Sequence, residues 1–498
     1  MTTTTSPTTE RAVRVLIVGS GFAGIGAAIT LRARGIGDLV ILERAASLGG
    51  TWRDNRYPGC ACDVESVLYS FSFAPNPDWS RTFAGSSEIH RYLERVATEY
   101  EVLPHLRFDE TVQEAHWGEE AQRWIVQSTS GVWHAEHLIV ATGALSDPVR
   151  PDIPGLDTFA GPCFHTAQWD ASVPLEGKRV AIIGTGASAI QVIPAIQPRV
   201  GQLVVAQRTP AWVLPRHDRA IPAWRRALYR RVPRLQALAR LLQYLRHEIL
   251  FLPFRHPWLR RLAARILGRH LIRQVRDPAL RARLTPRYDI GCKRLLLSDD
   301  YLPAMTQPNV TLVAQGITQI TPTGFVTADG RTHAVDVLIL ATGFRPTDPP
   351  LAPHIRGRDG RSLADGWQGS PTAYMGTTVA GFPNLALLNG PNTGLGHSSV
   401  LMMFEAQCDH LNGLFDLLAL SGAQTAEPTL EAQTRHTRWI DEGHRATVWQ
   451  RGGCQSWYLD RTGRNSTLWP YGVGRFRRTV GQVDPEAYRL AGLAEHRD

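Results

Sequence analysis

The stretch Arg14–Gly24, RVLIVGSGFAG, decides the first half of the fold. Its apolar run RVLIV predicts a buried strand, and Gly19, Gly21 and Gly24 follow at once with the spacing G-x-G-x-x-G. A helical pattern extends to about Arg34, and a second strand over 39–42 ends at Glu43. Glycines so spaced permit a tight turn and let the backbone approach a pyrophosphate at the helix N-terminus. The stretch therefore predicts a βαβ unit that binds a dinucleotide.

A second stretch, Arg179–Ala189 (RVAIIGTGASA), repeats this pattern later in the chain. Its strand is RVAII, its turn reads G-x-G-x-x-A, and a helix and a strand over 203–206 follow. Beyond these two units we find no internal repeat. The turn residues predicted to meet the second nucleotide are Gly184, Thr185, Gly186, Ala187, Ser188 and Ala189.

The residue that follows the second strand differs between the two units. Glu43 lies 24 residues after Gly19, whereas Arg208 lies 24 residues after Gly184. An acid at this position hydrogen-bonds ribose hydroxyls, and an arginine suits a 2′-phosphate. The sequence therefore predicts FAD in the first unit and NADPH in the second.

Two later stretches, 138–143 (LIVATG) and 337–343 (VLILATG), are each expected to form a late strand of one nucleotide-binding domain. The fold class that follows is α/β, with two Rossmann-like dinucleotide-binding domains and a helical insertion in the NADPH domain. We expect the FAD domain to comprise 1–147 and 344–498, which includes a C-terminal segment. The linker and NADPH domain would comprise 148–210 and 288–343, and the insertion 211–287.

The insertion is strongly basic. It holds 19 arginines and no lysine against three acids, a charge of +16, so the rest of the chain carries 9 − 16 = −7. Solvated helices with aliphatic inner faces, broken at Pro233, Pro253 and Pro257, are the first interpretation. Contact with an acidic surface, including a peripheral membrane surface, is the second. Nucleic acid is not expected, because we recognise no base-reading module.

The composition is that of an ordinary globular protein, with 43% hydrophobic and 20% charged residues. This excludes a disordered chain, a coiled coil and a fibre. No stretch reaches the roughly 18 apolar residues of a membrane span, and Met1–Glu10 lacks the layout of a secretion signal. Six cysteines show neither metal-ligand spacing nor a C-x-x-C pair, so we expect reduced thiols, no metal and a cytoplasmic protein.

Two longer patterns carry the chemistry. After Glu43, the segment from Gly49 to Asp63 reads G-G-T-W, then Y-P-G and finally the aspartate. A glycine pair permits close backbone approach and Trp52 offers a flat surface, so we expect this loop to place a flavin ring near Asp63. Between the two units stands F-x-G-x-x-x-H-x-x-x-W-D, formed by Phe159, Gly161, His165, Trp169 and Asp170.

The two patterns resemble the fingerprints of the type I Baeyer–Villiger monooxygenases, which are class B flavin-dependent monooxygenases. That family carries F-x-G-x-x-x-H-x-x-x-W-(P/D) between its dinucleotide motifs, and G-G-x-W-x-x-x-x-(F/Y)-P-(G/M)-x-x-x-D after the first motif. Every specified position matches this sequence. The resemblance spans nearly the whole chain, including Ser456-Trp457-Tyr458 and Gly463-Arg464-Asn465, and departs from the family pattern in the arginine-rich insertion.

The resemblance implies an enzyme that uses FAD, NADPH and O2 to convert ketones to esters or lactones through a flavin C4a-peroxide. It assigns the catalytic cation to Arg294, within G-C-K-R, and the acid that orients this cation to Asp63. His165 is implied as an organiser of the linker and not as a base. The cofactor contacts that it further implies are Arg208, Thr209 and Lys293 at the 2′-phosphate, Trp457 towards nicotinamide and substrate, and Gly50, Thr51, Trp52, Tyr69 and Val112.

Other interpretations are open from the sequence. Asp63 could cap a helix starting at Val64, Arg294 and Arg208 could be surface charges, and Trp457 could belong to the core.

The nearest alternative enzyme is an N- or S-oxygenating flavin-containing monooxygenase. A disulfide reductase is disfavoured, because no redox cysteine pair stands near the flavin loop. A protein that keeps nucleotides only for structure is the alternative from another class. The ketone and the oligomeric state do not follow from the sequence.

Overall fold

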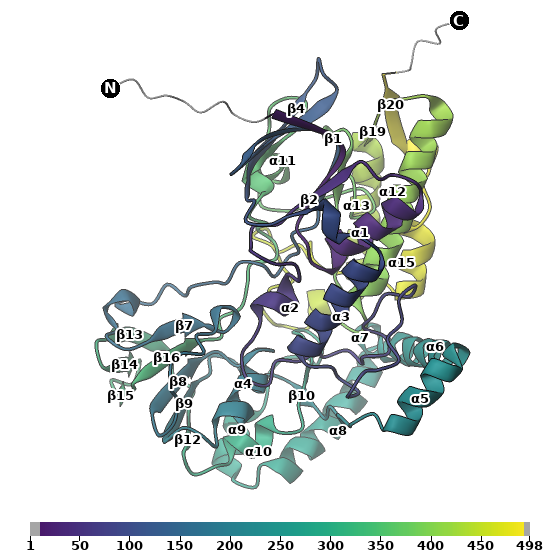
Figure 1. Cartoon of the computed structure of the whole chain (residues 1–498). Coiled ribbons are helices and arrows are strands. Elements are labelled where there is room, and N and C mark those ends of the chain that lie inside the picture. The colour runs from purple at the N-terminus through teal and green to yellow at the C-terminus, as the bar shows by residue number, and fades with distance from the viewer. Residues whose placement is uncertain (1–9, 493–498) are drawn as a thin grey trace, which may run out of the picture.

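The computed structural model describes residues 10–492, and the threonine-rich segment 1–9 lies outside them. Two sheets built around parallel strands form separate layers, one in the upper and one in the lower half of Figure 1. Segments from both ends of the chain build the upper part, and the arginine-rich helices lie beside the lower sheet. Within the described residues, no helix is long and apolar enough to cross a bilayer.

The larger sheet has eight strands in the order β17-β4-β5-β6-β1-β2-β3, with β18 paired to the end of β6. β1 runs parallel to both β2 and β6, and its residues Val15, Leu16 and Ile17 are fully buried, as the apolar run predicts. The strands are β1 Glu10–Val18, β2 Leu39–Leu42, β3 Leu106–Arg107, β4 Val112–Gly118, β5 Arg123–Ser128, β6 Gly131–Val140, β17 Ile355–Arg356 and β18 Leu385–Leu387.

The second sheet is fully parallel, with the order β12-β9-β8-β16-β7. It contains the second predicted βαβ unit, in which α4 connects β8 to β9. Its strands are β7 Cys163–His165, β8 Arg179–Ile183, β9 Gln202–Ala206, β12 Val310–Val313 and β16 Val337–Leu340. Smaller sheets are formed by β13 Ile317–Thr321, β14 Gly324–Thr327 and β15 Thr332–Ala334, by β10 Val213–Leu214 and β11 Leu296–Leu297, and by β19 Thr425–Pro428 and β20 Tyr488–Ala491.

Helices cover the sheets and connect their strands. α1 packs against α12, and α12 packs against α15. The helices outside the insertion are α1 Phe22–Ala33, α2 Thr51–Asp54, α3 Ser86–Glu99, α4 Ala189–Ile196, α10 Tyr301–Met305, α11 Leu363–Trp367, α12 Val400–Ser421, α13 Leu430–His444, α14 Val448–Arg451 and α15 Val473–Val480.

The insertion is helical, as predicted, and its prolines start helices. Pro233 and Pro257 are the first residues of α6 and α8, and Pro253 lies in the first turn of α7. The expectation of aliphatic inner faces is wrong for α6, whose large aliphatic side chains are all exposed, whereas α8 buries Leu267 and Leu271. The helices are α5 Ala223–Arg231, α6 Pro233–Leu250, α7 Leu252–Arg255, α8 Pro257–Gln274 and α9 Pro278–Leu284.

The chain passes between the two sheets twice, and the two passes are paired. Pro148 forms an antiparallel bridge with Phe344, and the Val149 amide donates to the Gly343 carbonyl over 2.8 Å. We propose the domain boundaries 1–147 with 344–498, 148–210 with 288–343, and 211–287. The distribution of strands between the two sheets supports this division.

The first glycine-rich turn has no room for side chains. Gly19 has a φ of +101°, and a Cβ added there would lie 2.8 Å from the Ala141 carbonyl oxygen. A Cβ on Gly24 would lie 1.9 Å from the Gly19 carbonyl oxygen. Both neighbours are backbone atoms, which cannot move aside, so the packing of β1 against α1 requires these glycines.

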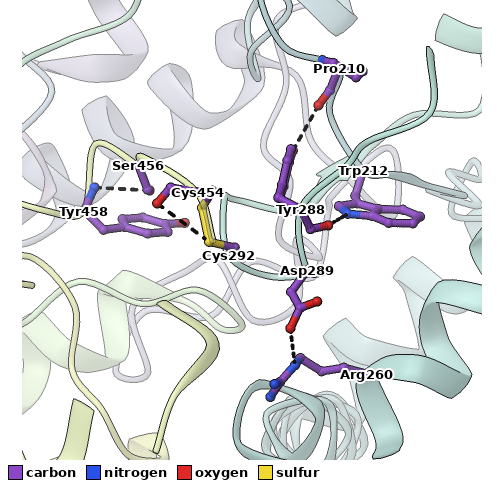
Figure 2. The surroundings of a disulfide bond; sticks show 9 residues. All are labelled: Pro210, Trp212, Arg260, Tyr288, Asp289, Cys292, Cys454, Ser456 and Tyr458. Carbon is purple, nitrogen blue, oxygen red and sulfur yellow. Dashed lines mark hydrogen bonds and ion pairs between the residues drawn. A yellow bond between two sulfur atoms is a disulfide. The ribbon is translucent and has the colours of Figure 1, made fainter. Parts of the chain in front are cut away.

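A disulfide joins Cys292 to Cys454, residues 162 apart in the sequence (Figure 2). The expectation that all six cysteines are reduced thiols is therefore wrong for these two, while Cys60, Cys62, Cys163 and Cys408 are free. The sequence held no local signal of this bond, because neither cysteine belongs to a spacing motif. The bond ties the segment that contains Lys293 and Arg294 to the loop that contains Trp457.

We expect Gly24→Ala to lower the melting temperature strongly. Forcing a methyl group into a packed contact costs about 1–3 kcal/mol or more. Gly268→Ala is the matched control, because it also lies in a helix but its added Cβ meets nothing within 4 Å. The control should keep or raise the melting temperature. Thermal unfolding followed by circular dichroism measures both variants, and equal stability of the two would contradict the tight-turn argument.

We expect the double replacement Cys292→Ser and Cys454→Ser to lower the melting temperature, since a disulfide commonly contributes about 2–4 kcal/mol. Reductant should lower the melting temperature of the wild type and leave that of the double variant unchanged. Thiol titration of the unreduced protein in denaturant gives a direct count. Four reactive thiols fit the bond, whereas six would show that it does not form.

Candidate active site

Arg294 and Asp63 form the central ion pair of the site. Arg294 precedes β11, and its Nε and Nη2 both donate to Asp63 Oδ2, over 2.9 and 2.6 Å. Both side chains are partly buried, with 29% and 27% exposure. The Asp63 charge is the main reason that the pKa of Arg294 lies above its ordinary value. The guanidinium is therefore a permanent cation, held in a fixed orientation by a carboxylate of the loop that follows the first βαβ unit.

The helix-cap interpretation of Asp63 is wrong. Its carboxylate binds Arg294, and turns rather than a helix follow it in the chain. Sequence reasoning thus brought together two residues 231 positions apart.

The segment from Tyr288 to Arg294 is held on several sides (Figure 2). The Tyr288 hydroxyl donates to the Pro210 carbonyl over 3.1 Å, and Trp212 Nε1 donates to the Tyr288 carbonyl over 3.0 Å. Two residues before Arg294, Cys292 is fully buried in its disulfide. These contacts leave the backbone that carries Arg294 little freedom to move.

Two aromatic residues border the same site from the C-terminal side. Tyr458 is almost fully buried, and its pKa is raised to about 12, mainly by burial, although the Arg294 charge opposes this rise. Its ring centroid lies 4.3 Å from that of Trp457, which is 39% exposed. Trp457 is therefore not a core residue. Arg294 Nη1 also donates to the Leu395 carbonyl, over 3.5 Å.

The predicted flavin loop packs against α1. Gly50 has a φ of +51° and is the N-cap residue just before α2, and Trp52 Nε1 donates to the Tyr69 hydroxyl over 3.0 Å. The Tyr69 ring in turn meets Phe22, the first residue of α1, at a centroid distance of 5.4 Å. Thr51, Trp52 and Tyr69 therefore lie together at the end of β1.

Glu43 sits where the βαβ pattern places it, at the end of β2. Its Oε2 accepts from the Ser20 amide over 3.0 Å, and its Oε1 accepts from Arg53 Nη1 over 2.9 Å. Burial alone would raise the pKa of Glu43, but the Ser20 hydrogen bonds and the Arg53 charge outweigh it and lower the pKa. Sequence reasoning missed Arg53, which occupies an unspecified position of the G-G-x-W pattern. Val112 begins β4, two residues after Glu110, whose amide donates to the Glu43 carbonyl over 2.9 Å.

The second nucleotide unit presents two cations without an acid. The pKa of Lys293 is lowered mainly by burial and further by the positive charge of Arg208, so the two side chains lie close together. Among the described residues, no carboxylate forms an ion pair with either side chain. Thr209 adjoins them, and its carbonyl accepts from the Thr185 hydroxyl over 3.3 Å. Gly186 and Ala189 lie at the start of α4, as predicted. This arrangement can hold a dianion.

The linker pattern forms a packed cluster. His165 ends β7 and accepts from the Ala167 amide over 3.1 Å, while Trp169 packs edge-on against Phe164 at 5.1 Å. A Cβ on Gly161 would lie 2.4 Å from the Asp336 carbonyl oxygen and 2.9 Å from the Phe159 ring. Burial lowers the pKa of His165 to about 4, so its imidazole is neutral at neutral pH. Asp170 lies at the surface and accepts from Ser172.

Comparison with known proteins agrees with this geometry. Residues 16–215 match the family described as pyridine nucleotide-disulphide oxidoreductase. The chain is 50% identical over 480 residues to a Baeyer-Villiger monooxygenase of Streptomyces coelicolor, which covers 96% of this chain and 92% of the relative.

Two crystal structures share the fold. Cyclohexanone monooxygenase from Rhodococcus sp. Phi1 bound to NADP+ has a TM-score of 0.88 and 29% identity, covering 97% of this chain and 99% of the other. The complex of OTEMO with FAD and NADP has a TM-score of 0.87 and 28% identity, covering 96% and 99%. Since half of its residues are shared with the Streptomyces enzyme along nearly the full length of both, this chain belongs to the Baeyer–Villiger monooxygenases.

Proposed function

We propose that this protein uses FAD, NADPH and O2 to oxidise ketones to esters or lactones. The observation that carries the proposal is the Asp63–Arg294 pair, a cation held in place by a carboxylate of the predicted flavin loop. Bound FAD, once reduced by NADPH, supplies the chemistry that activates O2 and transfers one oxygen atom. The chain supplies binding, orientation and a positive charge for the negative species that oxygen insertion requires.

The first unit fits FAD. The turn from Gly19 to Gly24 excludes side chains and presents backbone at the start of α1, where a pyrophosphate finds N–H donors. Glu43 is ionised and stands at the end of β2, where it can meet a ribose. The crystallised relative OTEMO binds FAD and NADP together, which supports the same pair of cofactors for this chain.

The second unit fits NADPH because of its cations. Arg208 and Lys293 provide two positive charges for a 2′-phosphate, and Thr209 adds a hydroxyl. Lys293 is adjacent to Arg294 in the chain, so the residues that would hold the phosphate and the ketone-activating cation share one anchored segment. We propose that Trp457 completes this side of the site and that His165, neutral and buried, organises the linker.

Arg294 would act by charge and geometry. Its guanidinium keeps its proton at neutral pH and can direct N–H groups at an oxyanion formed from the ketone carbonyl. Asp63 orients the guanidinium through two hydrogen bonds. An N- or S-oxygenating flavin monooxygenase has no comparable requirement for such a cation, and family membership favours the ketone reaction over that alternative.

We also propose a cytoplasmic location, from the sequence composition. The Cys292–Cys454 disulfide is the observation that opposes it, because structural disulfides are uncommon in that compartment. Rapid alkylation of intact cells followed by mass spectrometry of the two cysteine peptides decides this point.

The function is tested with a panel of linear, cyclic, aromatic and steroid ketones, supplied with NADPH and O2. We expect at least one product whose mass has increased by one oxygen atom and whose formation matches NADPH consumption. A panel that yields only sulfoxides or N-oxides from added nucleophiles would favour the alternative enzyme.

We expect Arg208→Ala to raise the KM for NADPH about tenfold or more, since hydrogen bonds to charged groups contribute about 1.5–3 kcal/mol. The KM for NADH should hardly change, because NADH lacks the phosphate. Arg199→Ala, which removes an exposed arginine paired with Glu176, is the matched control and should change neither value. Equal losses with both nucleotides in Arg208→Ala would contradict the phosphate assignment.

We expect Arg294→Ala to separate the two half-reactions. NADPH should still bleach the flavin, but ester formation should fall about 10²–10³-fold and the oxygen should appear as hydrogen peroxide. Arg294→Lys should be nearly as poor, since it lacks the rigid fork, and Asp63→Ala should be milder, since the cation stays.

The measurement is ester formed per NADPH consumed, alongside the rate of flavin reduction. Arg179→Ala removes another arginine–aspartate pair, with Asp336, and serves as the control. A wild-type ester yield from Arg294→Ala would refute the role of the cation.

A further inference from the structure

Helix α6 presents its apolar side to solvent. Five aliphatic residues recur at intervals of three and four and are between 39% and 65% exposed: Leu235, Leu238, Leu242, Leu245 and Ile249. This spacing gathers them in one stripe along the helix. An amphipathic helix of a globular protein normally turns such a stripe towards the core, so the orientation of α6 is inverted.

The opposite side of α6 is polar and binds the protein. Gln236 Nε2 donates to the Asn76 carbonyl over 2.7 Å, and Arg240 Nη1 donates to the carbonyls of Val67 and Ser70 over 3.1 and 3.0 Å. His247 Nε2 lies 2.8 Å from Glu65 Oε2. These bonds fix the orientation of the helix, so the outward stripe is a property of the folded chain.

Two further helices of the insertion, α5 and α8, also expose large apolar side chains. Trp224 on α5 and Trp258 on α8 are each 64% exposed, and Leu262, Ile266 and Ile272 of α8 are about half exposed. Fifteen of the 22 exposed large hydrophobic residues in the described chain lie between 224 and 272. Such a concentration is far from the scattered exposure of single apolar residues that needs no explanation. We call these residues of α5, α6 and α8 the outer face.

Arginines accompany the outer face. Arg261, Arg265 and Arg269 of α8 are exposed and recur every four residues, beside Trp258 and Ile266. None of the three forms an ion pair with a carboxylate of the described chain. The face therefore combines apolar anchors with cations that lack counter-charges of their own.

The combination of apolar side chains and arginines can be compared with three kinds of partner. A nucleic acid would neutralise the arginines but leave the leucines and tryptophans in water. A second copy of the chain would cover the leucines but bring arginines against arginines. The surface of an anionic bilayer satisfies both, because apolar side chains enter the headgroup boundary while arginines meet lipid phosphates. We propose that the outer face docks this enzyme on membranes that contain anionic lipids.

The test is co-sedimentation of the full-length, FAD-loaded protein with vesicles. One set is phosphatidylcholine alone and the other is phosphatidylcholine mixed with phosphatidylglycerol. We expect binding to the mixed vesicles only, and loss of most binding at about 1 M salt, where the Debye length is about 3 Å. Failure to bind the mixed vesicles at low salt would overturn the proposal.

Two variants locate the contact. Leu242→Ser with Ile249→Ser removes apolar anchors, and Arg261→Gln with Arg265→Gln and Arg269→Gln removes cations. Each set should weaken partitioning about tenfold or more, as expected from about 1 kcal/mol per arginine near an anionic surface. Flavin content and the rate with a water-soluble ketone should not change, which shows that the variants fold.

Matched controls lie outside the outer face. Leu420→Ser with Leu430→Ser removes two exposed leucines, 88% and 70% exposed, and Arg361→Gln with Arg438→Gln and Arg445→Gln makes the same change in net charge. Both should bind vesicles like the wild type. Equal losses in controls and variants would overturn the assignment of the face. So would light scattering that shows a dimer without vesicles which the Leu242→Ser and Ile249→Ser double variant abolishes.

Discussion

The ion pair of Asp63 and Arg294 is the contact on which the site depends, because it joins two stretches of chain that are far apart in the sequence. Asp63 comes from the loop behind the first βαβ unit, and Arg294 from the segment that returns from the insertion. Partial burial of both groups strengthens their attraction and obliges each to keep its partner. The surrounding contacts of Tyr288, Trp212 and Cys292 hold the backbone so that the pair can form.

The parts of the fold that the sequence predicted are those set by local pattern. Buried strands before G-x-G-x-x-G and G-x-G-x-x-A, the helices after them, and the residues at the ends of β2 and β9 follow from spacing and close packing alone. Asp63 and Arg294 were paired through a family resemblance, since no local rule connects residues so far apart. That pairing succeeded because the family pattern encodes a contact in space.

The features that the sequence did not predict have physical reasons. Cys292 and Cys454 stand far apart in the chain without a spacing motif, so only the fold brings them together. Arg53 occupies an unspecified motif position, and its bond to Glu43 depends on how α2 turns back to β2. The sequence predicted helices with aliphatic inner faces in the insertion, but an apolar helix face does not by itself tell which side of the helix meets the protein. Hydrogen bonds from Gln236 and Arg240 decide that question.

The disulfide has a mechanical consequence. The chain crosses between the two large sheets twice, near Pro148 and near Phe344, and the two crossings are paired. Two paired crossings of this kind can act as a hinge between the two parts of the molecule. Cys292 lies in the part of the chain that carries the second nucleotide unit, and Cys454 lies in the part that returns to the first unit. A covalent bond away from these crossings restrains rotation about them. While the disulfide is intact, the two nucleotide-binding units can rotate relative to each other only as far as the loops around Cys292 and Cys454 allow. A reductant would remove this limit.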